Sequence, residues 1–155
     1  MVCELNYDEL IVTIKEGISR EASQAYTAEG VSLYDAIKWT SRDGDHSKRL
    51  MADVLALIKI QCERFVCDVD QEVDGDIGEV TTVVITFHDN FRRIGGREET
   101  INTLLRSLIV NAFLNKYFVG KNQTELAAKY GAMAEADIKS LNTLLFAKRQ
   151  PIYPV

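Results

Sequence analysis

The sequence predicts a mainly α-helical protein, a bundle of about four to five helices with one inserted antiparallel β-hairpin over residues 65–73 and 80–88. Apolar residues recur at spacings of three and four along most of the chain, which is the period of an amphipathic helix. In one central stretch the spacing changes to two, the period of a half-buried strand. Because 46% of the 155 residues are apolar, we expect one core and one domain over residues 1–150, followed by an extended tail over 151–155.

Three helices are predicted before the hairpin. The first runs from Tyr7 to about Tyr26 and stops near Gly30. Ser32 is the expected N-cap of a short second helix. The apolar residues of these two helices are Leu10, Ile11, Ile14, Ile18, Ala22, Ala25, Leu33, Ala36, Ile37 and Trp39. Thr40 to His46 is expected to form a loop.

The third helix is expected from about Ser47 to Glu63. Its apolar residues occupy more than one side of the helix, as is typical of a helix surrounded by neighbours. These residues are Leu50, Met51, Val54, Leu55, Leu57, Ile58 and Ile60. We therefore expect it to be the central core helix.

The hairpin is predicted from alternation of apolar and polar residues. In the first strand Phe65, Cys67, Val69 and Val73 are expected on one side, and Val66, Asp68, Asp70 and Glu72 on the other. In the second strand Val83, Ile85 and Phe87 alternate with Thr82, Val84, Thr86 and His88. Because an isolated hairpin is marginally stable, it must pack on the helices or join a sheet from another subunit.

Two further helices follow a polar connection over residues 89–96. Glu98 and Glu99 lie in the first turn of the fourth helix, where carboxylates favour the positive end of the helix dipole. This helix is expected to end near Gly120, and Asn122 with Glu125 resembles a capping box that starts the last helix. The helical stripes are Ile101, Leu104, Leu105, Leu108, Ala112 and Phe113, then Leu126, Tyr130, Ala134, Ile138, Leu141 and Leu145. Two prolines, Pro151 and Pro154, prevent any continuation.

Charge and cysteine content limit the partners and the compartment. The net charge of −5, from 18 Lys and Arg against 23 Asp and Glu, opposes binding to nucleic acid or anionic membranes. No stretch approaches the roughly 20 apolar residues of a membrane span. Three cysteines and a start without a basic, apolar leader favour a reduced, cytoplasmic protein.

The acidic hairpin turn contains the best local motif for a metal. Asp70, Glu72, Asp74, Gly75 and Ile77 match five positions of a calcium loop. The twelfth position is a threonine instead of a bidentate glutamate, and the flanks alternate like strands where an EF-hand needs helices. We therefore favour a solvated turn, and Asp70, Glu72 and Asp74 remain weak candidate ligands.

The cysteines, the histidines and one glycine pair are the other candidates for a metal, catalytic or nucleotide site. Cys62 and Cys67 show no zinc spacing and are expected to be small core residues. His46 and His88 have no recognisable nucleophile or carboxylate partner and are expected at the surface. The pair Gly95-Gly96 precedes a helix, but there is no Walker lysine, so we expect a plain connection. The sequence thus predicts neither an enzyme nor a cofactor.

One charge asymmetry has two readings. The outward face of the hairpin is acidic, whereas the connection after it is basic. The residues are Asp68, Asp70 and Glu72 on the hairpin and Arg92, Arg93 and Arg97 on the connection. The simpler reading is that charges protect a strand edge from aggregation. The other is that the acidic hairpin of one subunit meets the basic connection of the next, in a contact that can close into a ring.

Several stretches resemble small proteins encoded beside tail and head genes in prophages of gut anaerobes. They are Tyr7-Asp8-Glu9-Leu10, then Gly30-Val31-Ser32-Leu33-Tyr34-Asp35-Ala36 with Thr40-Ser41, then Val110 to Phe118, and Lys148-Arg149-Gln150-Pro151. The resemblance implies a virion structural or neck component, similar to head-tail connector proteins that assemble as rings. It carries over no catalytic residues.

The leading hypothesis is a non-enzymatic phage or prophage structural protein, located in the host cytoplasm or the virion. It would bind itself and other virion proteins through the hairpin and through the tail, with Pro151 and Tyr153 in the contact. A cytoplasmic adaptor or regulatory module that binds a different protein through the acidic face is the alternative. A calcium-responsive module is a third option.

Overall fold

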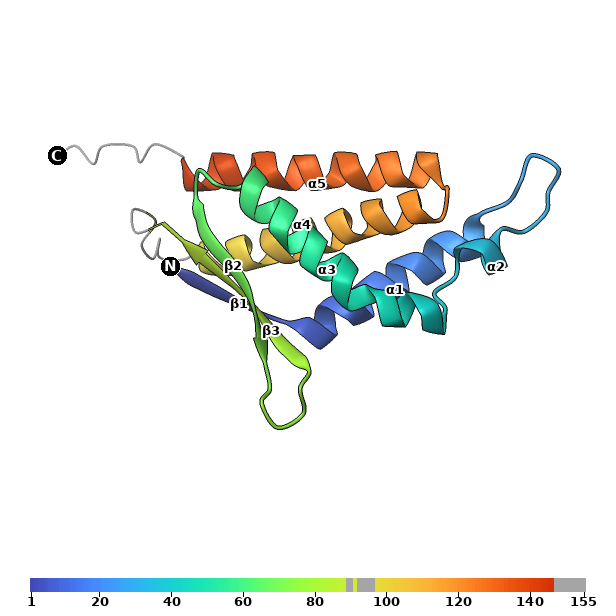
Figure 1. Cartoon of the computed structure of the whole chain (residues 1–155). Helices are drawn as coiled ribbons and strands as arrows, with labels where there is room; N and C mark the ends of the chain where they lie inside the picture. The colour runs from blue at the N-terminus through green and yellow to red at the C-terminus, as the bar shows by residue number, and fades with distance from the viewer. Residues whose placement is uncertain (89–90, 92–96, 147–155) are drawn as a thin grey trace, which may run out of the picture.

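The chain folds into a helical bundle with a small sheet at one end (Figure 1). The computed structural model describes residues 1–88, 91 and 97–146. Within these residues the elements are β1 (Val2–Asn6), α1 (Tyr7–Gln24), α2 (Tyr34–Ile37), α3 (Ser41–Gln61), β2 (Val66–Val73), β3 (Val80–Phe87), α4 (Glu98–Gly120) and α5 (Thr124–Leu145). The predicted helical bundle with an inserted hairpin is therefore confirmed.

The sheet has three antiparallel strands in the order β1-β3-β2. Strand β1 was not predicted, yet it pairs along β3, with Cys3 opposite Ile85 and Leu5 opposite Val83. Cys3 and Leu5 point into the core, whereas their neighbours on β1 are exposed. The hairpin thus receives its third strand from the start of the same chain and packs on the helices.

The predicted alternation holds in β3 but fails at both ends of β2, and Val73, predicted on the apolar side, is 57% exposed after a register shift. Val83, Ile85 and Phe87 are all buried. In β2 the register shifts between Val66 and Asp68, so the residue between them, Cys67, occupies a bulge and is exposed. Because a bulge inserts one extra residue, Val66 turns into the core. The expectation that Cys67 is a core residue was wrong, whereas Cys62 is buried as expected.

The central helix is α4, whereas the sequence pointed to α3. Helix α4 contacts α1, α3, α5 and β1, and its fully buried residues include Phe113 and Phe118. Helix α3 leaves Ile60 67% exposed and Leu57 37% exposed. An apolar surface on several sides of α3 therefore does not mean that neighbours surround it.

The predicted loop before α3 was wrong, because α3 begins at Ser41. Thr40 and Asp43 form a reciprocal capping box. The Thr40 hydroxyl accepts a hydrogen bond from the Asp43 backbone N–H, and the Asp43 carboxylate accepts one from the Thr40 N–H. This pairing satisfies two of the free N–H groups at a helix start.

Asn122 was predicted to be the N-cap of α5, but the N-cap is Gln123. Asn122 adopts a left-handed conformation with φ 58°, and its N–H donates to the carbonyl of Val119, while that of Gln123 donates to Phe118. These two bonds form a Schellman motif, in which asparagine can occupy the left-handed position. Asn122 therefore ends α4 and turns the chain back, so that α5 packs along α4.

The segment between α1 and α3 is only partly helical. Gly30, with φ 81°, lies in the turn after α1, where glycine has no steric cost. The Ser32 hydroxyl accepts a hydrogen bond from the N–H of Tyr34, but the N-cap of α2 is Leu33 and not Ser32 as predicted, and α2 comprises only four residues. No helix among the described residues has the length and hydropathy needed to cross a membrane.

Candidate interaction surfaces

The predicted acidic residues of the hairpin lie along β2 and are exposed. Asp68 pairs with Lys59 of α3 at 3.1 Å, so its charge already has a partner within the chain. Asp70 accepts a hydrogen bond from the N–H of Gln71. Glu72 forms no ion pair within the described ranges. Asp70 and Glu72 are therefore exposed to solvent and carry no ion pair with the described residues.

Asp74 organises the turn at the end of the hairpin. Its carboxylate accepts a hydrogen bond from the N–H of Asp76, its N–H donates to the carbonyl of Glu79, and its carbonyl accepts from the N–H of Gly78. Gly78 has φ 71°, a conformation that favours glycine. Asp74 thus has the structural role in the turn that the sequence suggested.

The three candidate calcium ligands do not converge. Asp70 and Glu72 are two residues apart on an extended strand, where side chains of one face are separated along the chain. Asp74 is engaged with the turn backbone. Among the residues that the structure describes, no group of three His, Cys, Asp or Glu side chains could hold a metal ion.

The basic connection is only partly within the described residues. Arg92 and Arg93, like Pro151 and Tyr153 of the tail, lie outside them. Arg97 is described, and its guanidinium donates a hydrogen bond to the carbonyl oxygen of Leu144 at 3.4 Å. Arg97 therefore already contacts the end of α5 in its own chain.

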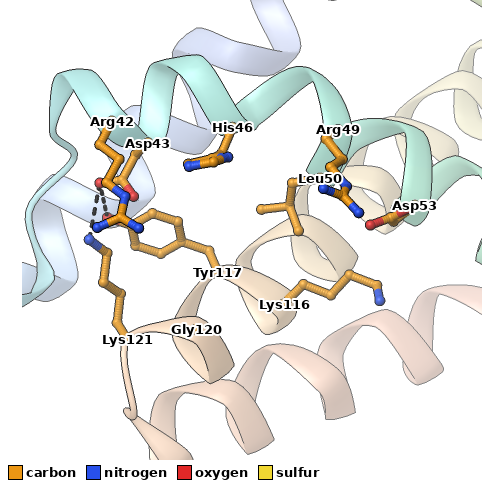
Figure 2. Close-up of a pocket in the computed structure, with 10 residues that line it drawn as sticks. All are labelled: Arg42, Asp43, His46, Arg49, Leu50, Asp53, Lys116, Tyr117, Gly120 and Lys121. Atoms are coloured by element: carbon orange, nitrogen blue, oxygen red, sulfur yellow. Dashed lines mark hydrogen bonds and ion pairs between the residues drawn. The ribbon is translucent and has the colours of Figure 1, made fainter.

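A charged cavity of about 460 Å³ lies between α3 and α4 (Figure 2). Helix α3 contributes Arg42, His46, Arg49 and Asp53, and Lys116 projects from α4. Asp43, Leu50, Tyr117, Gly120 and Lys121 complete the lining. The sequence analysis missed this cavity, because the two contributing segments are more than 60 residues apart in the chain.

The cationic groups of the cavity differ in their partners. Lys121 pairs with Asp43 at 3.1 Å. Arg42, Arg49 and Lys116 form no hydrogen bond or ion pair with the described part of the chain. Three side-chain cations therefore face the cavity and its surroundings without a carboxylate partner, an arrangement that attracts anionic groups.

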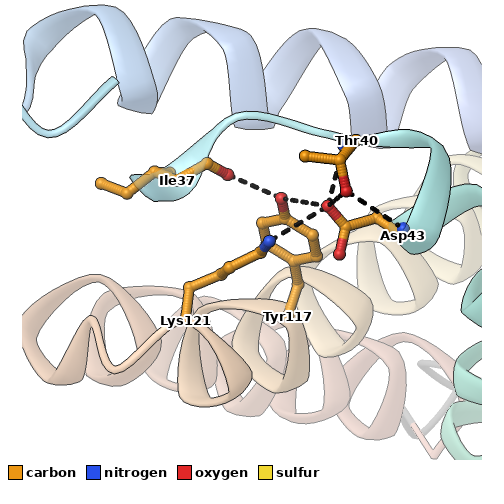
Figure 3. Close-up of polar contacts among 5 residues, drawn as sticks. All are labelled: Ile37, Thr40, Asp43, Tyr117 and Lys121. Carbon is orange, nitrogen blue, oxygen red and sulfur yellow. Dashed lines mark hydrogen bonds and ion pairs between the residues drawn. The ribbon is translucent and has the colours of Figure 1, made fainter. Parts of the chain in front are cut away.

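One wall of the cavity contains a hydrogen-bond network around Asp43 (Figure 3). Its Oδ2 atom accepts bonds from the N–H and hydroxyl of Thr40 and from Nζ of Lys121. Burial raises the pKa of Asp43, but the bonds from Thr40 and Lys121 outweigh this effect, so the pKa lies below its usual value. Asp43 is therefore ionised and fixed at neutral pH.

Tyr117 joins this network to α2. Its hydroxyl donates a hydrogen bond to the carbonyl of Ile37 at 2.6 Å, and the hydroxyl oxygen lies 3.4 Å from Oδ2 of Asp43. Burial and the nearby Asp43 carboxylate raise the pKa of Tyr117 well above its usual value. The ring stacks on Trp39, with centroids 5.8 Å apart. Tyr117 is therefore a neutral structural group.

A second buried carboxylate, Glu21, joins α1 to α5. Its Oε1 atom accepts hydrogen bonds from Nζ of Lys129 and from the hydroxyl of Tyr130, both at 2.7 Å. Burial raises the pKa of Glu21, but these two hydrogen bonds outweigh it and lower the pKa. Each group in the cluster has a partner from another helix, so it acts as a structural clamp.

The histidines and cysteines form no catalytic arrangement among the described residues. His46 is exposed in the cavity lining. His88 is half-buried, and its Nε2 donates to the carbonyl of Glu63 at 2.8 Å, so its predicted surface position was only partly right. Burial raises the pKa of the Cys3 thiol. It also raises the pKa of Cys62, to about 11, so both thiols are mostly protonated at neutral pH.

Comparison of the chain with models of protein families, with curated proteins and with solved structures found no match.

Proposed function

We propose that the protein is a non-enzymatic structural subunit of a phage or prophage particle, similar to a head-tail connector or neck protein. It self-associates through the hairpin, with residues 151–155 as a second contact, and binds other virion proteins. The resemblance in the sequence supports this proposal, as does the combination of a helical body with a projecting hairpin (Figure 1). Fold likeness alone does not give a function, so the argument depends on the surface of the hairpin.

The proposal depends on the hairpin tip, residues 73–80, where β2 ends and β3 begins. The tip extends away from α4 and α5 (Figure 1), and two large apolar side chains at its end are exposed, Val73 by 57% and Ile77 by 68%. Exposed apolar residues are common on proteins, but here both occupy one narrow projection. Burial against a neighbouring subunit would remove this apolar surface from water.

The free edge of β2 also supports assembly. In the sheet formed by the described residues, β2 pairs with β3 on one side and with no strand on the other, so its other edge has backbone groups available for pairing. Asp68, Asp70 and Glu72 are spaced along this edge. Charged residues at an edge discourage unspecific strand pairing, while a neighbour of complementary charge can still approach it.

Light scattering coupled to size-exclusion chromatography tests the proposal. The full chain is expected to form an oligomer of one discrete size. The fraction of protein in this oligomer should rise with protein concentration and fall as salt is added. Ile77→Ser should weaken it, whereas Val119→Ser, which changes a residue 61% exposed on α4, should not. A monomer at every concentration would contradict self-association and favour the adaptor that binds a different protein.

A further inference from the structure

We propose that the cavity between α3 and α4 receives the acidic hairpin tip of a second copy of the chain. This inference rests on the proposed function and specifies which surfaces meet. In this arrangement the acidic hairpin binds to the cavity and not to the basic connection. Arg97 of that connection already donates to Leu144 of its own chain, whereas the cavity has cations without partners.

The charges of the two surfaces are opposite. Residues 65–88 contain six acidic residues and no lysine or arginine. The rest of the chain has 17 acidic and 18 basic residues, so the hairpin accounts for the net negative charge of the protein. Asp70, Glu72, Asp76 and Glu79 form no ion pair within the described residues. The hairpin is therefore a concentrated anionic element.

The cavity offers a matching cationic surface. Arg42 lies at one end, and Arg49 and Lys116 lie at the other (Figure 2). None of these three cations has a partner within the described chain, so an incoming carboxylate would not have to displace an existing ion pair. Opposite potentials of this kind steer two proteins together and fix their orientation.

Apolar groups on both surfaces match as well. The exposed Ile77 of the tip is flanked by Asp76 and followed two residues later by Glu79. The cavity has the half-buried Leu50 between its two charged ends (Figure 2). Its volume of about 460 Å³ is that of a small-molecule site, about 300–1,000 Å³, which is room for a few side chains of the turn. A narrow turn can therefore place Ile77 against Leu50 and its carboxylates against the cations.

The geometry of one chain makes this a contact between copies. In Figure 1 the hairpin tip projects away from the helices, whereas the cavity lies between α3 and α4. A contact between two different surfaces is heterologous, so each subunit can give a tip to one neighbour and receive a tip from another. Repetition of this contact closes into a ring or extends into a filament, depending on the rotation between neighbours.

Charge-reversed variants of the full chain test the inference by light scattering. Arg49→Glu with Lys116→Glu changes the cavity, and Asp76→Lys with Glu79→Lys changes the tip. Each double variant should raise the dissociation constant of the assembly by about tenfold or more. The matched control is Lys48→Glu with Lys139→Glu, which reverses two exposed lysines outside the cavity and should leave the assembly intact.

Mixing the two variants separates a lost contact from a lost fold. The cavity variant keeps a normal tip and the tip variant keeps a normal cavity, and the two reversed surfaces are also opposite in charge. An equimolar mixture should therefore associate, although each variant alone does not. Circular dichroism and thermal melting check that each variant is folded. For a variant that does not fold, Lys116→Gln or Glu79→Gln replaces the double change, with a smaller loss of assembly expected.

The outcomes separate this inference from the proposed function. Oligomeric wild type with an unchanged assembly in the folded cavity variant would overturn the docking inference alone, as would a mixture that stays monomeric. A monomeric wild type would overturn both. If a short oligonucleotide binds wild type and loses binding in the cavity variant, whose assembly is unchanged, the cavity is a nucleic-acid site and the docking inference is wrong.

Discussion

The hydroxyl of Tyr117 donates a 2.6 Å hydrogen bond to the carbonyl oxygen of Ile37, 80 positions earlier in the chain. Ile37 ends α2, a helix of only four residues, and too short to be stable alone. The bond therefore fixes α2 on the central helix α4. Tyr117 also lines the cavity, so the same side chain connects the core to the proposed docking site.

Tyr117→Phe should destabilise the protein by about 1–3 kcal/mol, because it leaves the Ile37 carbonyl without its donor in a buried place. Urea unfolding measures the change. Tyr34→Phe is the matched control, since Tyr34 is 43% exposed and its change should fall within about 0.5 kcal/mol. Equal effects of the two substitutions would contradict a specific role for the Tyr117 hydroxyl.

Glu21 should make the stability depend on acid pH. Its pKa in the folded protein lies below the unfolded value of about 4.5, so its contribution is fully present above that value and is lost as the pH falls through the folded pKa. Glu21→Gln should therefore be less stable than wild type at neutral pH, and the difference should shrink on acidification. Urea unfolding at a series of pH values tests this.

The matched control for the pH dependence is Glu16→Gln, also on α1 and exposed. It should leave the pH dependence close to that of wild type. A Glu21→Gln variant that keeps the full acid dependence would show that Glu21 is not responsible.

Leu5→Ala should lower the free energy of unfolding by about 2–5 kcal/mol, because Leu5 is 1% exposed in the core and its truncation leaves a cavity. Val2→Ala is the control on the same strand, with Val2 57% exposed, and should change stability by less than about 0.5 kcal/mol. Similar small effects at both positions would mean that β1 does not pack as described.

Strand β1 shows why part of the fold could not be predicted from the sequence. Cys3 and Leu5 do alternate with exposed residues, but two buried residues in a five-residue strand give a weak pattern. Its partner β3 lies about 80 residues away, and such pairing leaves no local signal. The hairpin strands and α4, by contrast, have long periodic patterns, and their existence was confirmed, although the side chains predicted to face the core were right in β3 and partly wrong in β2.

The start of α3 was missed for a different reason, because its signal is present in the sequence. Thr40 followed three residues later by Asp43 is a capping pair with aspartate where glutamate is usual. The charged residues around it resembled a loop. The cavity that this helix start forms was not predictable, since Arg49 and Lys116 become neighbours of one cavity only when α3 packs on α4.

Gly131→Ala should destabilise the contact between α4 and α5. An added Cβ atom would lie 2.9 Å from Nδ2 of Asn115, which donates a 2.6 Å hydrogen bond to the carbonyl of Ala127. Moving Asn115 breaks this bond, and overpacking costs about 1–3 kcal/mol, more than the about 1 kcal/mol gained in helix propensity. Thermal unfolding should show a lower midpoint.

Gly120→Ala is the control for the Gly131 prediction. A Cβ atom at Gly120 meets nothing within 4 Å, and the residue lies in the last turn of α4. The change should therefore be neutral or slightly stabilising. A Gly131→Ala protein as stable as Gly120→Ala would mean that the helices have room to separate.

Cys67 should be the one fast-reacting thiol of the folded protein. The bulge in β2 exposes it, whereas Cys3 and Cys62 are buried, and burial raises the pKa of Cys62 to about 11. A chromogenic disulfide reagent should therefore modify one thiol rapidly at neutral pH and the other two only when the protein unfolds. Cys67→Ser should remove the fast phase and leave the slow one unchanged. A fast phase that persists in Cys67→Ser would place another cysteine at the surface and contradict the bulge.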